Sequence, residues 1–164
     1  MALIGVRPTT PELVGRQAAW ESIRAAFTDA AGGRLRVALC VGDPGIGKSH
    51  LLAVVADRLA SAGARVLQGG ASEVESMPPY LPFLEALGPW IRQAPIKQVV
   101  SDVGSGALVL TTVYPDLTAR LRDPVTSPAL PPAQARLRLF EAVGRYLAAL
   151  AARQPLVLIL DDLQ

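Results

Sequence analysis

The eight residues from Gly42 to Ser49 read GDPGIGKS and fit the spacing of a phosphate-binding loop, G-x-x-x-x-G-K-[ST]. Glycines at this spacing accept backbone angles closed to other residues and carry no Cβ, so backbone N–H groups can surround an anion. Lys48 would supply a mobile positive charge for the outer phosphates, which also makes it a candidate catalytic residue, and Ser49 would supply a hydroxyl for Mg²⁺. The loop therefore predicts phosphate binding.

The other residues of the motif contribute backbone rather than charge. Pro44 stiffens the loop and lowers the entropy cost of ordering it. His50 lies in the first turn after Ser49, where a helix-surface role and a role beside the nucleotide both stay open. The alternative is a glycine turn that fits the spacing by chance, and the flanking apolar segments favour the phosphate loop. The predicted phosphate-binding residues are Gly42, Asp43, Pro44, Gly45, Ile46, Gly47, Lys48, Ser49 and His50.

Short elements on both sides position the loop. The segment Leu35–Val41 (LRVALCV) is apolar and rich in β-formers, so it predicts a strand. A helix is expected from Lys48 to about residue 62, and Gly63 ends it. A second strand over Ala64–Gly69 completes a βαβ unit, which implies a parallel sheet with a right-handed crossover. The expected buried face of the helix is Leu51, Leu52, Val55 and Leu59.

Upstream of the loop, residues 1–12 read as an extended lead-in broken by prolines, and a helix is expected from Arg16. Gly32 and Gly33 end that helix. Its buried face is predicted to be Trp20, Ile23, Ala26 and Phe27.

Downstream of the second strand, residues 70–132 read as a helical insert. A helix is expected after Pro82, with a break or bend at Gly88 and Pro89, followed by two short helices and a proline-rich connector over residues 123–132. The clearest helix is Ala133–Arg153, and the apolar run Leu156–Leu160 predicts a fully buried strand. The expected buried faces are Phe83, Leu84, Leu87 and Ile91 in the first helix and Leu137, Phe140, Val143, Leu147 and Leu150 in the last.

Two acids, Asp161 and Asp162, end this last strand. A strand that ends in a polar turn is the alternative, but a phosphate loop in the same chain favours a metal site, because a nucleotide with Mg²⁺ needs a carboxylate near Ser49. In open α/β sheets, ligands gather at the carboxyl ends of the strands. We expect Asp161 to hold Mg²⁺ with Ser49, and Asp162 to act as a catalytic residue that orients the attacking water.

The composition is that of a globular protein, with 51% hydrophobic and 18% charged residues over 164 residues. The net charge is only +2 and basic residues are spread along the chain, which favours a solvated surface over a nucleic-acid footprint. Cys40 is the single cysteine, so neither an internal disulfide nor a cysteine metal site is expected. The chain shows no signal peptide and no run of 18 apolar residues, so we expect a cytoplasmic protein without a membrane span.

Five stretches in this order, ELVGR, GDPGIGKSHLLA, PYLPFLEAL, RLFEAV and LVLILDDLQ, resemble the ATPase domain of signal-transduction NTPases with numerous domains (STAND). These are AAA-type ATPases, including the origin-recognition-like group, and occur in large LuxR-type transcriptional regulators and some bacterial cyclases and kinases. The resemblance covers nearly the whole chain. The loop and the acids are generic to P-loop ATPases, whereas ELVGR and PYLPFLEAL are more specific.

The resemblance implies an α/β fold of the P-loop NTPase class (AAA/ASCE type), a parallel sheet with flanking helices and strand order 5-1-4-3-2. It implies ATP and Mg²⁺ as cofactors and places Val14, Gly15 and Arg16 near the adenine. Gln17 departs from the Glu common in these families. The resemblance also implies a sensor strand and a helical lid after Gln164, so we expect an incomplete domain, truncated after the acidic (Walker B) strand. Its expected parts are residues 1–12, 13–69, 70–132 and 133–164.

We therefore expect a Mg-ATP-binding module of a multidomain bacterial signalling or transcriptional regulator, a nucleotide switch with slow hydrolysis in the intact family. ATPase turnover by this chain stays open, because the sensor and lid parts are not expected in it. One alternative is a truncated regulatory or interaction fragment with little turnover, and another is a P-loop small-molecule kinase. The resemblance allows self-association through the domain, and direct DNA binding would lie in a C-terminal domain outside this chain.

Overall fold

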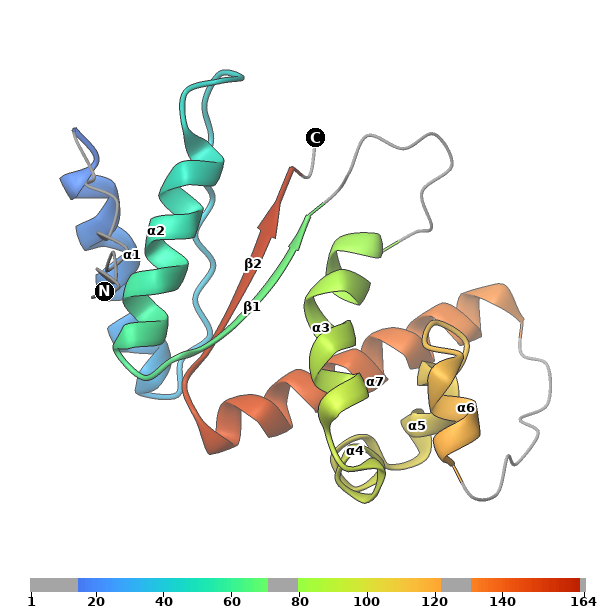
Figure 1. The fold of residues 1–164 in the computed structure, drawn as a ribbon. Coiled ribbons are helices and arrows are strands. Elements are labelled where there is room, and N and C mark those ends of the chain that lie inside the picture. The colour runs from blue at the N-terminus through green and yellow to red at the C-terminus, as the bar shows by residue number, and fades with distance from the viewer. Residues whose placement is uncertain (1–14, 71–79, 122–130, 163–164) are drawn as a thin grey trace, which may run out of the picture. The chain divides into compact units, whose positions relative to one another are not determined.

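The computed structural model of the chain describes residues 15–70, 80–121 and 131–162 (Figure 1). Two compact units divide the chain by their internal contacts, residues 1–66 and residues 67–164. The lead-in predicted for residues 1–12 and most of the connector predicted for residues 123–132 lie outside the described residues.

Two helices, followed by the first residues of a strand, form the regular structure of the first unit within residues 15–66. Helix α1 spans Gln17–Ala31 and ends at Gly32, and Gly33 follows in a left-handed conformation at φ 90°, as predicted for glycine after a helix. Helix α2 spans Lys48–Ser61 and is followed by Gly63 at φ 87°. The face predicted for α1 is half-buried, and the fully buried residues of α2 are Leu51, Val54, Val55, Ala56 and Leu59. Both helices are thus confirmed with boundaries close to those predicted.

The strand predicted for Leu35–Val41 is wrong, because this segment has no regular secondary structure and belongs to no sheet among the described residues. Four apolar side chains are largely exposed there, with Leu35 at 89% and Val41 at 91%. A strand exists only when a neighbour pairs with its backbone, and the described part of the chain pairs no strand with this segment. The predicted βαβ unit is therefore not formed as such, since only its helix and its second strand are observed.

The second unit packs helices against a two-stranded sheet. Strand β1, Arg65–Gly70, begins at the boundary between the units and pairs with β2, Leu156–Asp161; both arrows point the same way in Figure 1, so the pair is parallel. The pairing of β1 with β2 agrees with the predicted strand order 5-1-4-3-2, in which β1 is the second strand, β2 is the third, and the two are adjacent. The helices between the strands are α3 Leu81–Gln93, α4 Ile96–Val103, η1 Gly104–Gly106, α5 Ala107–Leu110, α6 Asp116–Arg120 and α7 Pro132–Arg153.

One local expectation in this unit is settled in part and one needs correction. Of the break or bend expected at Gly88 and Pro89, the break does not occur, because helix α3 continues to Gln93. Pro89 forfeits one backbone hydrogen bond of the helix, and the buried side chains of Leu87 and Ile91 on either side of it hold the helix in the core. Strand β2 was expected to be fully buried, but only Ile159 is, because β1 is its sole neighbour among the described strands.

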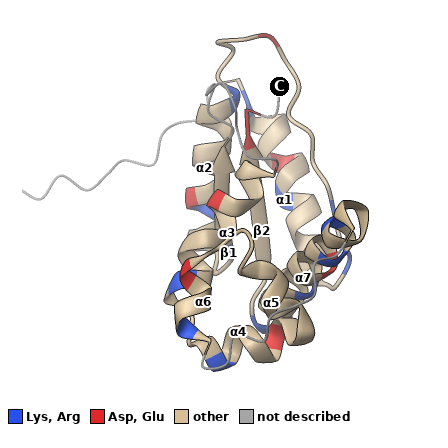
Figure 2. Cartoon of the chain, turned by 90° about the vertical axis from the view of Figure 1, so that its right-hand side faces the viewer, with Lys and Arg blue, Asp and Glu red and all other residues tan. Residues whose placement is uncertain are grey.

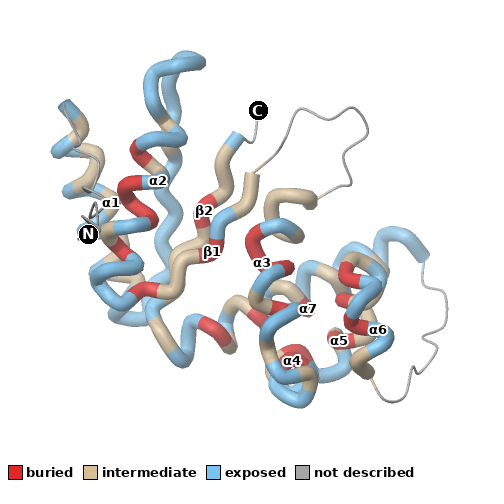
Figure 3. The backbone as a smooth tube through the Cα atoms, viewed as in Figure 1, coloured by how far each residue is buried: buried red, intermediate tan, exposed pale blue. Residues whose placement is uncertain are grey.

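The core of the second unit joins α3, α4, α5 and α7 to β1, and its buried residues are coloured red in Figure 3. Tyr114 lies at its edge and donates a hydrogen bond to the Leu84 carbonyl at 2.9 Å. Burial raises the pKa of the Tyr114 phenol, so this side chain stays a neutral donor. At the end of α7, Arg153 pairs with Asp102 of α4, whose side chain is only 4% exposed.

The face that α7 turns to this core agrees with the predicted one in Leu150, which is buried, and in Val143 and Leu147, which are half-buried against the core, but it differs elsewhere. Its fully buried residues are Ala142, Tyr146 and Leu150, whereas Leu137 and Phe140 are 59% and 49% exposed. Phe140 instead makes an edge-to-face contact with Tyr80, with ring centroids 5.1 Å apart. The buried face is set by close approach of two small residues, since a Cβ on Gly106 would lie 2.8 Å from the Cβ of Ala142.

Charged residues are dispersed along several helices in Figure 2 rather than gathered on one of them, in line with the predicted solvated surface. None of the helices that the structure describes combines the length and the apolarity needed to cross a membrane.

Candidate phosphate-binding site

The predicted phosphate loop connects the irregular segment 34–41 to the first residue of α2. Gly45 and Gly47 have φ angles of 76° and 89°, in the left-handed region where a side chain would be strained. The Ile46 N–H donates to the Asp43 carbonyl at 3.4 Å and closes a turn between them. The two glycines thus have the backbone freedom for which the motif requires them.

Helix α2 begins directly at the loop. Its first intrahelical hydrogen bond runs from the Leu51 N–H to the Gly47 carbonyl at 3.0 Å, and no side chain caps it. The amides of the first turn therefore have no partner within the helix, and the positive end of the helix dipole lies beside the loop. Together these features favour an anion at this position. Ser49 and His50 occupy that first turn and are exposed.

Lys48 folds back over the loop. Its Nζ donates to the carbonyls of Gly42 and Asp43, at 2.9 Å and 3.1 Å. A full positive charge is therefore held within reach of the loop backbone, although its present partners are neutral carbonyl oxygens. A phosphate oxygen would be a stronger partner, because it adds a full negative charge to a hydrogen bond whose donor is already charged.

Helix α1 contacts the loop and the segment before it. Gly15, at φ 70°, precedes Arg16, whose guanidinium donates to the Ile46 carbonyl of the loop. At the other end of α1, Asp29 holds Arg34 and Arg36 of the segment that leads to the loop, each at 2.7 Å. The Arg36 guanidinium lowers the pKa of the Asp29 carboxyl. Val14, the third residue predicted near the adenine, lies outside the described residues.

The two predicted acids lie at the end of β2. Asp161 is its last residue and is half-buried, and Asp162 follows in a left-handed conformation at φ 58°. The Asp162 N–H donates to Asp161 Oδ1 at 3.0 Å, which orients the Asp161 carboxylate. The acids belong to the unit of residues 67–164 and the loop to the unit of residues 1–66. Their meeting in one site therefore stays a prediction.

The sequence pattern of the AAA ATPase domain family matches residues 12–164, nearly the whole chain. The chain belongs to this family. No curated protein and no solved structure matches it. Membership in a family of AAA ATPase domains implies that the chain binds a nucleotide, usually with Mg²⁺. Within the described residues, no group of three or more His, Cys, Asp or Glu side chains could hold a metal ion by itself.

Several contacts of this AAA ATPase domain were not predicted from its sequence, and two of them involve residues beside the predicted site. One joins Arg16 to a carbonyl of the loop. The other joins Glu85 of α3 to the end of β1, where Glu85 Oε2 accepts the Gly70 N–H at 3.2 Å. Gly70 ends β1 and Asp161 ends β2, and the two strands are parallel neighbours. Glu85 therefore lies at the same end of the sheet as Asp161. Neither contact has a sequence signal, because each joins a side chain to a backbone group distant along the chain.

Proposed function

We propose that this AAA ATPase domain binds ATP with Mg²⁺ on the loop Gly42–Ser49. The observation that carries the proposal is the arrangement of that loop, with two left-handed glycines, the N-terminus of α2 and the Lys48 amine on one short segment. Backbone N–H groups and a helix N-terminus attract phosphate because the charge of the anion meets several fixed partial charges at once.

Lys48 would exchange its carbonyl partners for the outer phosphates when the nucleotide binds. The exchange is favourable because the phosphates are charged and the Gly42 and Asp43 carbonyls are not. We assign Val14, Gly15 and Arg16 to the adenine side and the loop with His50 to the phosphate side. Lys48 is thus both a binding residue and, through its charge on the phosphates, a catalytic one.

The Ser49 hydroxyl and Asp161 are the residues that would hold Mg²⁺, which supplies positive charge to the phosphate oxygens when bound. Asp162 would orient the water that attacks the terminal phosphate. In this proposal hydrolysis is slow, and the bound nucleotide acts mainly as a switch. The hydrogen bond from the Asp162 N–H to Asp161 Oδ1 supports a defined orientation for the Asp161 carboxylate.

We further propose that the domain is the nucleotide switch of a multidomain bacterial signalling or transcriptional regulator of the STAND and LuxR type. The stretches ELVGR and PYLPFLEAL support this finer assignment, because they accompany the generic loop and acids in that order. The family match supports the coarser one, an AAA ATPase domain.

A direct titration tests nucleotide binding. A fluorescent ATP analogue with Mg²⁺ should bind saturably, with a Kd in the micromolar range, about −8 kcal/mol. Unlabelled ATP should displace the analogue, whereas adenosine should displace it only weakly, since the proposed site is built around phosphates. A signal that unlabelled ATP does not displace would contradict the proposal.

Replacing Asp161 by asparagine tests the metal assignment. The variant keeps an oxygen for the Asp162 N–H but loses the charge that would hold Mg²⁺. We expect the gain in ATP affinity on adding Mg²⁺ to fall by about tenfold, or about 1.4 kcal/mol, while the affinity for ATP without Mg²⁺ stays within about twofold. Titrations with and without Mg²⁺ measure both quantities.

Asp116→Asn is the matched control, because Asp116 is an exposed carboxylate of the same unit and the change in charge is the same. It should leave both affinities unchanged. If Asp161→Asn keeps the full effect of Mg²⁺, Asp161 does not hold the metal.

A further inference from the structure

The orientation of one peptide group in the phosphate loop depends on a residue outside the loop. The Ile46 carbonyl accepts a hydrogen bond from the Arg16 guanidinium, 30 residues earlier in the chain. In a trans peptide the C=O and the following N–H point in opposite directions. By holding the Ile46 carbonyl, Arg16 therefore also sets the direction of the Gly47 N–H.

This peptide group is one that could turn over without such a contact. Gly47 stands at φ 89°, and glycine adopts positive and negative φ about equally readily. A rotation of the Ile46–Gly47 peptide would bring a carbonyl oxygen to the side where the N–H was, and a carbonyl repels an anion. The Arg16 contact opposes that rotation because turning the carbonyl away would break the hydrogen bond.

The position of Arg16 is itself fixed by neighbouring contacts. Its carbonyl accepts the Trp20 N–H at 3.0 Å as α1 begins. The Trp20 ring lies under the Arg58 guanidinium of α2, with 5.0 Å between the guanidinium carbon and the ring centroid. Arg16 directly precedes α1, and Trp20 lies in the first turn of that helix. The start of α1 is thereby tied to the loop at Ile46 and to α2 at Arg58.

Lys48 cannot hold the loop carbonyls in place while a nucleotide is bound. Its partners are the Gly42 and Asp43 carbonyls, which it would leave for the phosphates in the proposed function. Arg16 holds the Ile46 carbonyl, later in the loop, and would keep it, because the proposed function does not draw the Arg16 side chain to the phosphates.

We propose that Arg16 is a positioning residue of the phosphate loop, which holds the Ile46 carbonyl so that the Gly47 N–H stays turned toward the phosphates. The inference rests on the proposed nucleotide binding. It gives the Arg16 side chain a role separate from any contact of the segment Val14–Arg16 with the adenine. Arg16 then affects affinity through the phosphates, whichever base is attached to them.

The test compares two ligands that share phosphates but not a base. Mg-ATP and inorganic tripolyphosphate with Mg²⁺ are titrated, by competition with the fluorescent analogue, into the wild-type chain, Arg16→Ala and Arg16→Lys. Arg16→Ala should weaken both ligands by the same factor, about tenfold, as expected for one hydrogen bond from a charged donor. Arg16→Lys keeps a long cationic donor and should recover most of the loss for both ligands.

The salt dependence separates positioning from a direct charge effect. The Ile46 carbonyl is neutral, so the ratio of wild-type to Arg16→Ala affinity should stay constant between low and high salt. An attraction between the Arg16 charge and the ligand would instead shrink with salt. Circular dichroism would show whether Arg16→Ala has a reduced folded fraction. If it does, the affinities of the wild-type chain and of the folded Arg16→Lys variant are compared instead, at low and at high salt.

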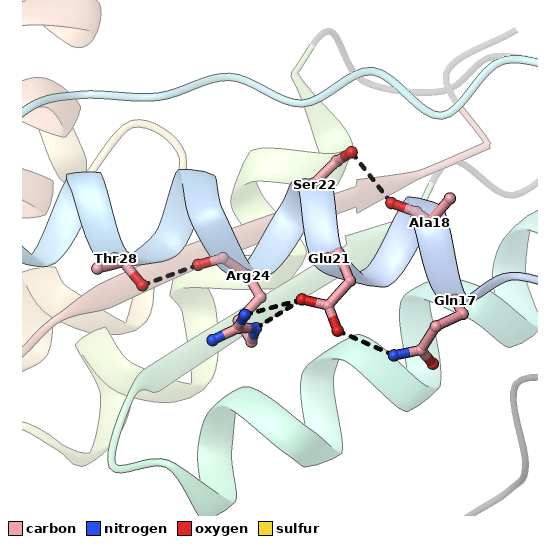
Figure 4. A network of polar contacts seen from close by, with 6 residues as sticks. All are labelled: Gln17, Ala18, Glu21, Ser22, Arg24 and Thr28. Carbon is pink, nitrogen blue, oxygen red and sulfur yellow. Dashed lines mark hydrogen bonds and ion pairs between the residues drawn. The ribbon is translucent and has the colours of Figure 1, made fainter.

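Arg24→Ala is the matched control, because it removes a guanidinium from the same helix. Arg24 pairs with Glu21 of α1 at 2.8 Å, in a network of contacts within the helix (Figure 4). It should leave both affinities unchanged. Two outcomes would overturn the proposal. One is a loss of affinity in Arg16→Ala for ATP but not for tripolyphosphate, since Arg16 would then act on the base. The other is an unchanged affinity of Arg16→Ala for both ligands. Failure of the wild-type chain to bind either ligand would overturn the proposed function itself, and this inference with it.

Discussion

Replacing Lys48 by alanine is expected to lower the affinity for Mg-ATP by about hundredfold. The ammonium group is the one full positive charge that the loop itself carries, and a hydrogen bond from a charged donor contributes up to about 3 kcal/mol. A loss of about 2.7 kcal/mol corresponds to that factor. The measurement is displacement of a fluorescent ATP analogue at equilibrium, with the fold of each variant checked by circular dichroism.

Lys97 provides the control for this prediction. It is the other lysine of the chain and is exposed on α4, far along the chain from the loop. Lys97→Ala changes the net charge by the same amount and should bind ATP like the wild-type chain. Equal affinities of the Lys48 and Lys97 variants would remove the loop from the proposed site.

The helices and two of the three expected strands could be predicted because their signals are local. Helix α2 begins at the loop motif and ends before Gly63, and α7 ends before Pro155. Glycine and proline act on their own backbone, and helical spacing is repeated within a few turns. The neighbours of a residue along the chain are enough to predict these features.

The strand at Leu35–Val41 was predicted wrongly, and the buried face of α7 was predicted only in part, because both depend on partners elsewhere in the chain. Alternating or continuous apolar residues favour an extended backbone, but a neighbouring strand must supply the hydrogen bonds. On α7, two apolar stripes of helical spacing lie side by side. The stripe through Ala142 is buried because Gly106 allows a close approach there, and the spacing alone cannot reveal that.

For the site, the sequence motif predicted which residues form the loop and that the loop leads into the N-terminus of a helix. The sequence could not predict which carbonyls Lys48 and Arg16 contact, since any backbone group within reach is a possible acceptor. Arg16 was associated with the adenine by resemblance alone. Its contact with Ile46 depends on the path of the chain between α1 and the loop, which is a property of the whole first unit.

The close contact between β1 and α3 leads to the largest expected effect on stability. A Cβ on Gly69 would lie 1.9 Å from the carbonyl oxygen of Pro82 and 3.0 Å from the Ala86 nitrogen. Both neighbours are backbone atoms of α3, so no side chain can rotate away. Gly69→Ala must therefore move the strand or the helix apart. Overpacking of this kind costs about 1–3 kcal/mol and occasionally more, and we expect about 3 kcal/mol here because the contact is so short.

Urea unfolding of Gly69→Ala and Gly70→Ala measures this difference. The loss for Gly69→Ala would lower Tm by roughly 10 °C in a chain of this size. Gly70 is the neighbouring residue of β1, and a Cβ there meets no heavy atom within 4 Å. Gly70→Ala keeps the N–H that donates to Glu85 and should change the free energy of unfolding by less than about 0.5 kcal/mol. Equal stability of the two variants would mean that α3 does not approach β1 as closely as the Gly69 contact requires.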